Sequence, residues 1–286
     1  TNVMAAWVLA RAGDILERLS PHRRQSVERR LVIGDDELKR WDTISRRLKV
    51  VFHDDDIISQ FEGYADLEEL DWDAYRNKYG DIQRLDRILE SEGDSPNRYK
   101  LSKQADVLML FYLFSTDELV GILGRLGYTL DADSIRRNVE YYAKRTSDGS
   151  TLSHIVRSWV QARSDREGSW GRFLDALNVD IADVQGGTTS EGIHLGAMAG
   201  TVDMLHRCYT GLETRDDVLH FSPTLPADVR ELRLDIRYRQ QRVNVRINHN
   251  RFVLESAPLR AAPITVSYKG DKRILGPGEQ TEYALT

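Results

Sequence analysis

Apolar residues recur every three or four positions through most of the first 212 residues, which is the spacing of amphipathic helices. The pattern predicts helices over 1–20, 36–49, 73–90, 101–114, 116–126, 132–146, 151–164, 166–178 and 190–210. Clusters of glycine, proline and aspartate separate them, for example Gly34-Asp35-Asp36 and Gly93-Asp94-Ser95-Pro96. We therefore expect residues 1–212 to be almost wholly helical.

After Leu212 the hydrophobic period changes from about 3.6 to 2. Apolar and polar residues alternate strictly over 232–238, 243–247 and 264–268, as in half-buried antiparallel strands. Shorter strands are expected over 252–254, 274–275 and 283–285. The fold class predicted is multidomain, mainly α then β, with a helical domain over 1–214 and a small antiparallel β-sandwich over 215–286.

Composition excludes several classes of protein. The chain has 286 residues, 30% of them charged, and a net charge of −5 with both signs interleaved, so nothing indicates nucleic acid or an anionic membrane as a partner. No apolar run reaches the roughly 18 residues of a membrane span, and no signal peptide is visible. The single cysteine, Cys208, has no partner for an internal disulfide. We expect a cytoplasmic protein.

The stretch from Gly186 to Thr201 is the most informative part of the chain. Two glycines and three hydroxyl residues precede a run of apolar and small residues, an arrangement that leaves N–H groups available to an anion at a helix N-terminus. The same residues also form a capping box, with Thr188 as N-cap and Glu191 three positions later. An anion site that includes His194 and a capped helix without ligand both remain open on residue chemistry alone.

Polar residues in two other places are candidates for a binding site. Lys103 and Gln104 stand at the mouth of a predicted helix, where they either contact sugar hydroxyls or form a solvated helix start. Glu92, Asp94 and Arg98 lie in a loop that their own hydrogen bonds would equally explain. The acidic run at 54–56 has no metal-ligand spacing, so we predict no metal.

Three segments together resemble one known family. They are Glu92–Tyr99 followed by Lys103–Val107, then Arg145–Ser153, then Gly186–Thr201. In this order they resemble glycoside hydrolase family 65, the inverting phosphorylases and hydrolases of α-glucosides such as trehalose, maltose and kojibiose. The resemblance covers almost the whole chain. It implies part of an (α/α)6 helical barrel followed by the small β-domain of that family.

The resemblance also implies roles for particular residues. Lys103 and Gln104 match the pair that binds the glucosyl unit in this family. The phosphate-binding residues that we predict are Ser150, Gly187, Thr188, Thr189, Ser190 and His194. Asp148 departs from the histidine that many members carry, and its carboxylate would either repel phosphate or serve as the base that activates water.

By the same resemblance, the general-acid glutamate precedes residue 1, so no catalytic acid is expected within the chain. We expect the chain to be the C-terminal part of a longer enzyme and to be inactive by itself. The other expected partners are an α-glucoside disaccharide, the upstream part of the polypeptide and, in the complete enzyme, a second copy. Inorganic phosphate would be the co-substrate, without any cofactor.

Three functions are consistent with these residues. The first is an inverting disaccharide phosphorylase of the trehalose type that releases β-glucose 1-phosphate. The second is a trehalase-like hydrolase of the same family, with Asp148 or Glu191 near the water. The third is a non-catalytic carbohydrate-binding fragment.

Overall fold

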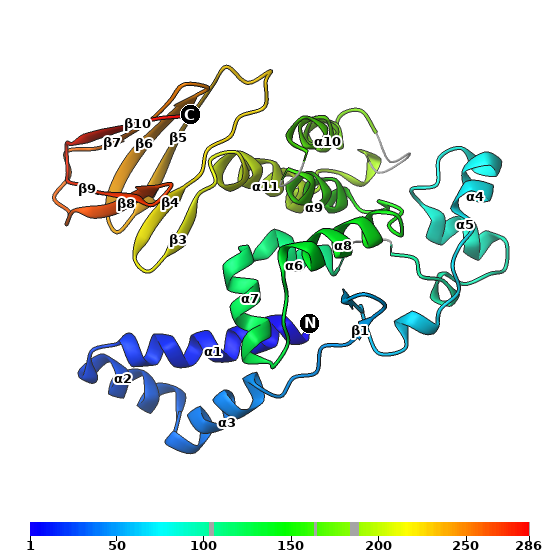
Figure 1. The fold of residues 1–286 in the computed structure, drawn as a ribbon, viewed down its shortest axis with the longest axis horizontal. Helices are drawn as coiled ribbons and strands as arrows, with labels where there is room; N and C mark the ends of the chain where they lie inside the picture. Colours follow the sequence, from blue (N-terminus) through cyan, green and yellow to red (C-terminus); the bar gives the residue numbers. More distant parts are fainter. Residues whose placement is uncertain (103–105, 163–164, 184–188, 286) are drawn as a thin grey trace. The chain divides into compact units, whose positions relative to one another are not determined.

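A computed structural model describes residues 1–102, 106–162, 165–183 and 189–285 of the chain. The chain forms two compact units, residues 1–147 and 148–286 (Figure 1). In the part that the structure describes, the first unit consists of helices, a two-stranded hairpin and long connections, and the second combines helices with two four-stranded sheets. Residues 46–71 contain no α-helix, so the expectation that residues 1–212 are almost wholly helical is wrong there. The predicted succession of a helical part and a strand-rich part is confirmed.

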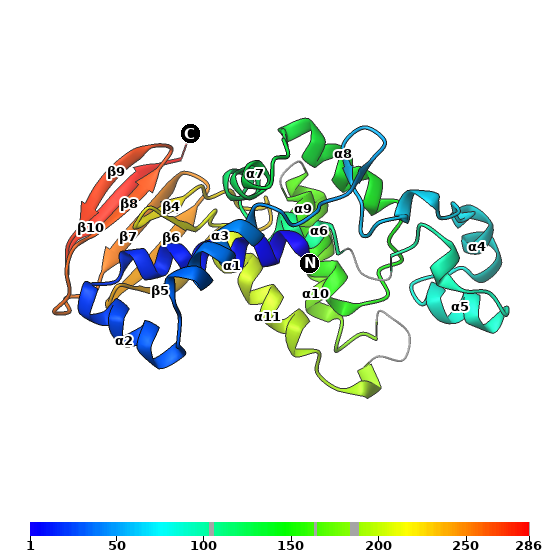
Figure 2. The same cartoon turned by 90° about the horizontal axis from the view of Figure 1, so that it is seen from below.

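The first unit begins with α1 (Asn2–Arg18), which lies beside α3, as both views show (Figures 1 and 2). Its other helices are α2 (Pro21–Leu31), α3 (Asp35–Ser45), α4 (Trp72–Tyr79), α5 (Leu85–Ser91), α6 (Leu108–Leu113), α7 (Thr116–Arg125) and α8 (Ala132–Ala143). Two 3₁₀ turns, η1 (Tyr64–Asp66) and η2 (Pro96–Arg98), and the antiparallel pair of β1 (Phe52–His53) and β2 (Ile57–Ile58) connect them. The hairpin packs against α8.

The pattern of apolar residues misses α2 because this helix has no buried residue. Pro21 occupies its first turn, where the missing N–H costs nothing, and Arg24 bonds Glu28 at 2.7 Å one turn later. The single helix predicted over 73–90 is also wrong. Gly80, with a φ of 73°, ends α4, and α5 starts only at Leu85.

The second unit begins with three helices, α9 (Thr151–Gln161), α10 (Arg166–Asn178) and α11 (Leu195–Asp203). A 3₁₀ turn, η3 (Thr189–Glu191), precedes α11, and a π-helical turn, η4 (Met204–Cys208), continues it. The three helices contact one another. Because Gly200 has no side chain, α11 can pack close to α9. A Cβ at this position would lie 2.8 Å from Cγ2 of the fully buried Ile155 on α9.

Two four-stranded sheets follow, in the orders β10-β7-β6-β5 and β3-β4-β8-β9 (Figure 1). Their strands are β3 (Glu213–Arg215), β4 (Val218–Phe221), β5 (Glu231–Tyr238), β6 (Gln241–Asn248), β7 (Arg251–Ser256), β8 (Ile264–Tyr268), β9 (Asp271–Leu275) and β10 (Gln280–Ala284). The ring of Phe252 on β7 lies 4.8 Å from that of Phe221 on β4, which joins the two sheets through an apolar core.

One strand pair departs from the predicted antiparallel arrangement. β4 and β8 are parallel, with Val218 opposite Thr265. The strands between them, β5 to β7, belong to the other sheet, so the chain crosses over before β8 and no hairpin dictates its direction.

Replacing Gly200 by alanine tests the contact between α9 and α11. We expect Gly200→Ala to lower the free energy of unfolding by about 1–3 kcal/mol, because the β-branched Ile155 has to move. Gly196→Ala is the matched control in the same helix, since nothing lies within 4 Å of its Cβ position and alanine is favoured over glycine by about 1 kcal/mol. Denaturant unfolding compares them, and equal stability of the two variants would contradict the proposed contact.

Candidate active site

A cavity of about 390 Å³ lies in the first unit, between the first residues of the chain, the β1–β2 hairpin and the start of α6. Its polar lining includes Asn2, Lys49, Ser59, Gln60, Glu62 and Asp106. Lys49 and Glu62 form an ion pair of 2.7 Å at exposed positions, and the amide of Asn2 donates to the carbonyl of Lys49. Amide, hydroxyl and charged groups around a cavity of this size suit the hydroxyls of a sugar.

Lys103 and Gln104 lie outside the described residues, whereas Ser102 and Asp106 on either side are described. The buried Ser102 accepts a hydrogen bond from the amide of Gln60, a lining residue of the cavity, and Asp106 lines the cavity itself. Ser102 also forms a β-bridge with Thr146, and this extended backbone explains why the helix predicted over 101–114 begins only at Leu108.

Two buried side chains of α8 hold the β1–β2 wall of the cavity. The amide oxygen of Asn138 accepts from the backbone N–H of Ile58 at 2.8 Å, and its NH₂ group donates to the carbonyl of Asp56 at 2.9 Å. The hydroxyl of Tyr142, one turn later, donates to the carbonyl of Ile58. These bonds fix the strand that leads to Ser59 and Gln60.

The acidic run between the two strands forms a turn. Asp54 and Asp56 have φ values of 44° and 62°, and the N–H of Asp56 donates to the carbonyl of Asp54. Among the described residues, no group of three or more histidine, cysteine, aspartate or glutamate side chains is arranged to hold a metal ion.

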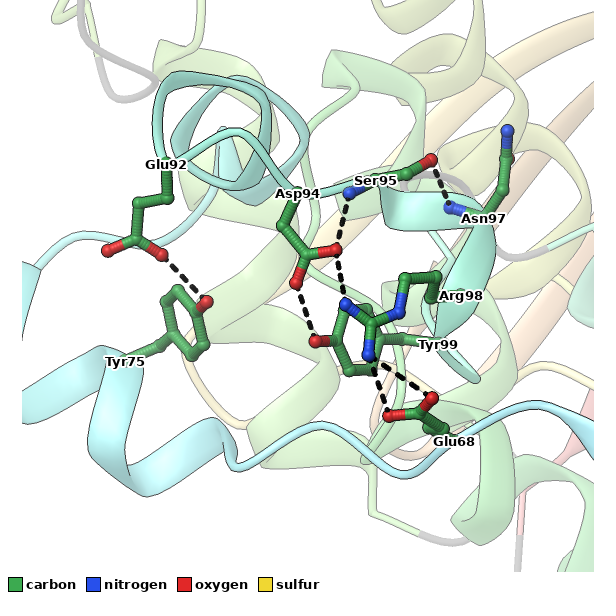
Figure 3. Close-up of polar contacts among 8 residues, drawn as sticks. All are labelled: Glu68, Tyr75, Glu92, Asp94, Ser95, Asn97, Arg98 and Tyr99. Carbon is green, nitrogen blue, oxygen red and sulfur yellow. Dashed lines mark hydrogen bonds and ion pairs between the residues drawn. The ribbon is translucent and has the colours of Figure 1, made fainter.

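The loop motif from Glu92 to Tyr99 is held together by its own side chains (Figure 3). Asp94 accepts from the N–H of Ser95, from Arg98 at 2.9 Å and from the hydroxyl of Tyr99 at 2.7 Å. Arg98 also donates to Glu68. These hydrogen bonds give Asp94 and Arg98 a structural role in the loop.

Glu92 connects the same loop to α4 through hydrogen bonds. It accepts from Lys78 and from the hydroxyls of Tyr79 at 2.6 Å and Tyr75 at 2.8 Å. The contact with Lys78, followed by those with Tyr79 and Tyr75, lowers the pKa of Glu92 to about 2. The carboxylate is therefore ionised throughout the physiological range.

Asp148 opens the second unit immediately before α9. Its backbone is left-handed, with a φ of 58°, and its carboxylate contacts the guanidinium of Arg157 on α9. Both side chains are only 16% exposed. Burial lowers the pKa of Arg157, and the charge of Asp148 opposes that shift. The negative charge at this position is thus compensated inside the protein.

His154 lies on α9 as well, and it is not among the site residues predicted from the sequence. It is buried, and neither ring nitrogen has a hydrogen-bond partner among the described residues. Burial lowers the pKa of His154, while the charge of Asp148 acts in the opposite direction. The ring is therefore neutral at physiological pH.

The helix predicted over 190–210 starts five residues later than expected. Gly192 has a φ of 99°, which an α-helix excludes, and His194 rather than Thr188 is the N-cap of α11. The backbone N–H of His194 donates to Asp180 Oδ2 at 2.9 Å, and its ring nitrogen Nδ1 lies 2.6 Å from Asp180 Oδ1. Sequence reasoning missed Asp180, which has no helical or strand spacing to His194.

The remaining phosphate-binding candidates have different surroundings. Gly187 and Thr188 lie outside the described residues. The backbone N–H of Thr189 donates to Asp183 at 3.1 Å, whereas its hydroxyl oxygen is buried without a hydrogen-bond partner in the described part of the chain. Ser190 is exposed, and Ser150 is the N-cap of α9 without a side-chain capping bond.

Comparison with known protein families identifies the family of the chain. Residues 1–203 match the central catalytic domain of glycosyl hydrolase family 65, and residues 212–275 match the C-terminal domain of that family. The chain belongs to glycosyl hydrolase family 65. The family assignment made from the three sequence segments is confirmed.

Relatives within family 65 include both characterised and uncharacterised proteins. An uncharacterized glycosyl hydrolase of Mycobacterium tuberculosis is 51% identical over 99% of the chain. The trehalose 6-phosphate phosphorylase of Lactococcus lactis is 30% identical over 100%, and the alpha,alpha-trehalose phosphorylase of Thermoanaerobacter brockii 26% over 98%. The chain spans 21%, 35% and 34% of the lengths of these three proteins, respectively.

A solved structure shares the fold. A putative kojibiose phosphorylase from the human microbiome superposes with a TM-score of 0.74 at 19% identity, covering 100% of the chain and 39% of that protein. Among the described helices, none is long and apolar enough to cross a membrane.

The pH dependence of the loop next to α4 provides a test of its hydrogen bonds. The pKa of Glu92 is about 2 in the folded protein, against an ordinary value of 4.5, so its stabilising effect is complete above pH 4.5 and is lost as the pH falls towards 2. We expect Glu92→Gln to accelerate hydrogen exchange of α4 and α5 at pH 7 and to have progressively less effect below pH 4.5. Glu90→Gln, at an exposed position of α5, is the control. A difference that is independent of pH would contradict this account.

Proposed function

We propose that the chain is part of an inverting phosphorylase of α-linked glucose disaccharides of the trehalose type, which releases β-glucose 1-phosphate. Inverting cleavage needs a general acid at the leaving oxygen and a nucleophile on the opposite face of the sugar ring. In a phosphorylase the nucleophile is phosphate, which needs hydrogen-bond donors rather than a carboxylate base.

The ion pair between Asp148 and Arg157 is the observation on which this proposal rests. A hydrolase would need an available carboxylate to activate water, and Asp148 is the candidate within the second family segment. Its carboxylate is instead bonded to the buried guanidinium of Arg157 on the following helix. The pair balances the negative charge that would repel phosphate and engages the carboxylate that would otherwise be available to a water molecule.

The start of α11 supplies groups that suit an anion. His194 is the N-cap of a nine-residue helix, and the buried hydroxyl oxygen of Thr189 lacks a partner among the described residues. We propose that the phosphate binds here, with Ser150, Gly187 and Thr188 as further contacts.

The cavity of the first unit is the proposed site of the glucosyl unit. Gln60 lines it and bonds Ser102, which directly precedes Lys103 and Gln104. Asn2 lines it as well, and the family resemblance assigns the general-acid glutamate to sequence that precedes residue 1. A sugar in this cavity would contact both the Lys103–Gln104 pair and the general-acid glutamate. We propose that no cofactor is required.

The names of two relatives support phosphorolysis of a trehalose-type substrate, either trehalose or its 6-phosphate. The 51% identical mycobacterial relative is named a glycosyl hydrolase, which makes a hydrolase the second candidate. We further propose a cytoplasmic enzyme that assembles with a second copy when complete.

Dependence on phosphate separates the two candidates. We expect the full-length enzyme to cleave trehalose or trehalose 6-phosphate only when phosphate is present and to form β-glucose 1-phosphate, with kojibiose as a comparison substrate. Product analysis with and without phosphate provides the measurement. Turnover that is indifferent to phosphate and sharply reduced by Asp148→Asn, in a variant whose melting temperature shows that it is folded, would establish the hydrolase instead.

Removing the imidazole of His194 tests the phosphate site. Loss of one charge-assisted hydrogen bond costs about 1.5–3 kcal/mol, so we expect His194→Ala to raise the KM for phosphate about 10- to 100-fold. The KM for the disaccharide should change much less, because only the anion needs this donor. His206→Ala, in the π-helical turn after α11, is the control. Equal weakening of phosphate and disaccharide would exclude the assigned role.

A further inference from the structure

One carboxylate holds both the backbone and the ring of His194. Asp180 follows the end of α10 by two residues and precedes His194 by 14 positions. Its Oδ2 accepts the backbone N–H at 2.9 Å, and its Oδ1 lies 2.6 Å from the ring nitrogen Nδ1. Two contacts from one rigid carboxylate fix the position of the main chain and the rotation of the ring together.

The contact with Asp180 also decides which ring nitrogen carries the proton. An ionised carboxylate only accepts hydrogen bonds, so a bond of this length requires a hydrogen on Nδ1. In the neutral ring Nε2 then has a lone pair, and in the imidazolium it has a hydrogen that an anion can accept. Nε2 lies on the side of the ring away from Nδ1, so it is directed away from Asp180.

The surroundings of Asp180 favour a dedicated role over a loose surface contact. Its side chain is only 10% exposed, whereas that of His194 is 25% exposed, so the carboxylate is the more enclosed partner. The hydrogen bond from the His194 side chain lowers the pKa of Asp180. The carboxylate therefore remains ionised when it accepts the two hydrogen bonds.

We propose that Asp180 is a positioning residue for phosphate: it accepts the hydrogen of Nδ1 and orients the His194 ring so that, in the imidazolium, the Nε2–H donates to the anion. This inference rests on the proposed function, in which His194 binds the attacking phosphate. Asp180 itself does not touch the substrate. Its effect on turnover comes entirely through the orientation and protonation of His194.

The tautomer of His194 can be measured without any assay of activity. In solid-state ¹⁵N NMR of the full-length protein with labelled histidine, the His194 signals are identified by their absence from His194→Ala. We expect the neutral ring of the wild type to be the Nδ1–H tautomer and Asp180→Asn to convert it, at least in part, to the Nε2–H tautomer. A wild-type ring protonated at Nε2, or a tautomer unchanged by Asp180→Asn, would overturn the proposal.

Kinetics of the full-length enzyme then test the connection to phosphate. We expect Asp180→Asn to raise the KM for phosphate about 10- to 100-fold, because the amide neither fixes the ring nor balances the charge of the imidazolium that donates to the anion. The KM for the disaccharide should stay within about twofold. Asp203→Asn is the matched control. Asp203 lies on α11, the helix that His194 caps, and it accepts a hydrogen bond from Arg207 at 2.7 Å instead of from a histidine. If both variants affect phosphate equally, the positioning role is refuted.

Two further comparisons keep the result interpretable. Asp180→Glu retains the carboxylate and serves as a second variant in case Asp180→Asn folds poorly. We expect it to bind phosphate more tightly than Asp180→Asn, and no such recovery would count against the proposal. Wild-type turnover that does not depend on phosphate would remove the proposed function. The NMR measurement would still decide whether Asp180 determines the tautomer of His194.

Discussion

Buried side-chain hydrogen bonds to the backbone hold the loops of this chain where helix packing alone would leave them without partners. Asn138 is the clearest case, because its amide satisfies an N–H of β2 and a carbonyl of the preceding turn at once. The hairpin it holds has only two residues in each strand, too few for stability by themselves. Together with the hydroxyl of Tyr142, this side chain of α8 holds the cavity wall that leads to Gln60.

Three of the carboxylates described above share a feature. Asp94, Asp148 and Asp180 each accept from a neighbouring arginine or histidine, so their charges are used within the protein. Such pairing orders loops, and where the partner is an arginine it also lowers the local negative potential. An anionic co-substrate benefits from both effects, whereas a water molecule that needs a base benefits from neither.

The change from helix to strand near residue 215 could be predicted because periods of 3.6 and 2 are properties of consecutive residues. The helix α2 could not be predicted from that pattern, because its residues are all at least partly exposed and only Pro21 marks its start. The start of α11 was misplaced because the positive φ of Gly192 depends on the surrounding loop. Asp180 and Arg157 escaped notice for a related reason: their contacts with His194 and Asp148 join residues 14 and 9 positions apart.

The parallel pairing of β4 with β8 has a consequence for how the protein acquires its structure during synthesis. β4 is made early in the β-rich part, yet its sheet partner Ile264–Tyr268 follows only after β5, β6 and β7 of the opposite sheet. Until that segment leaves the ribosome, β4 has only the three-residue β3 as a neighbour and its other edge stays open. Closing a loop of this length is slow compared with forming a hairpin, so nascent chains in this interval are the ones most exposed to misassociation and to chaperones.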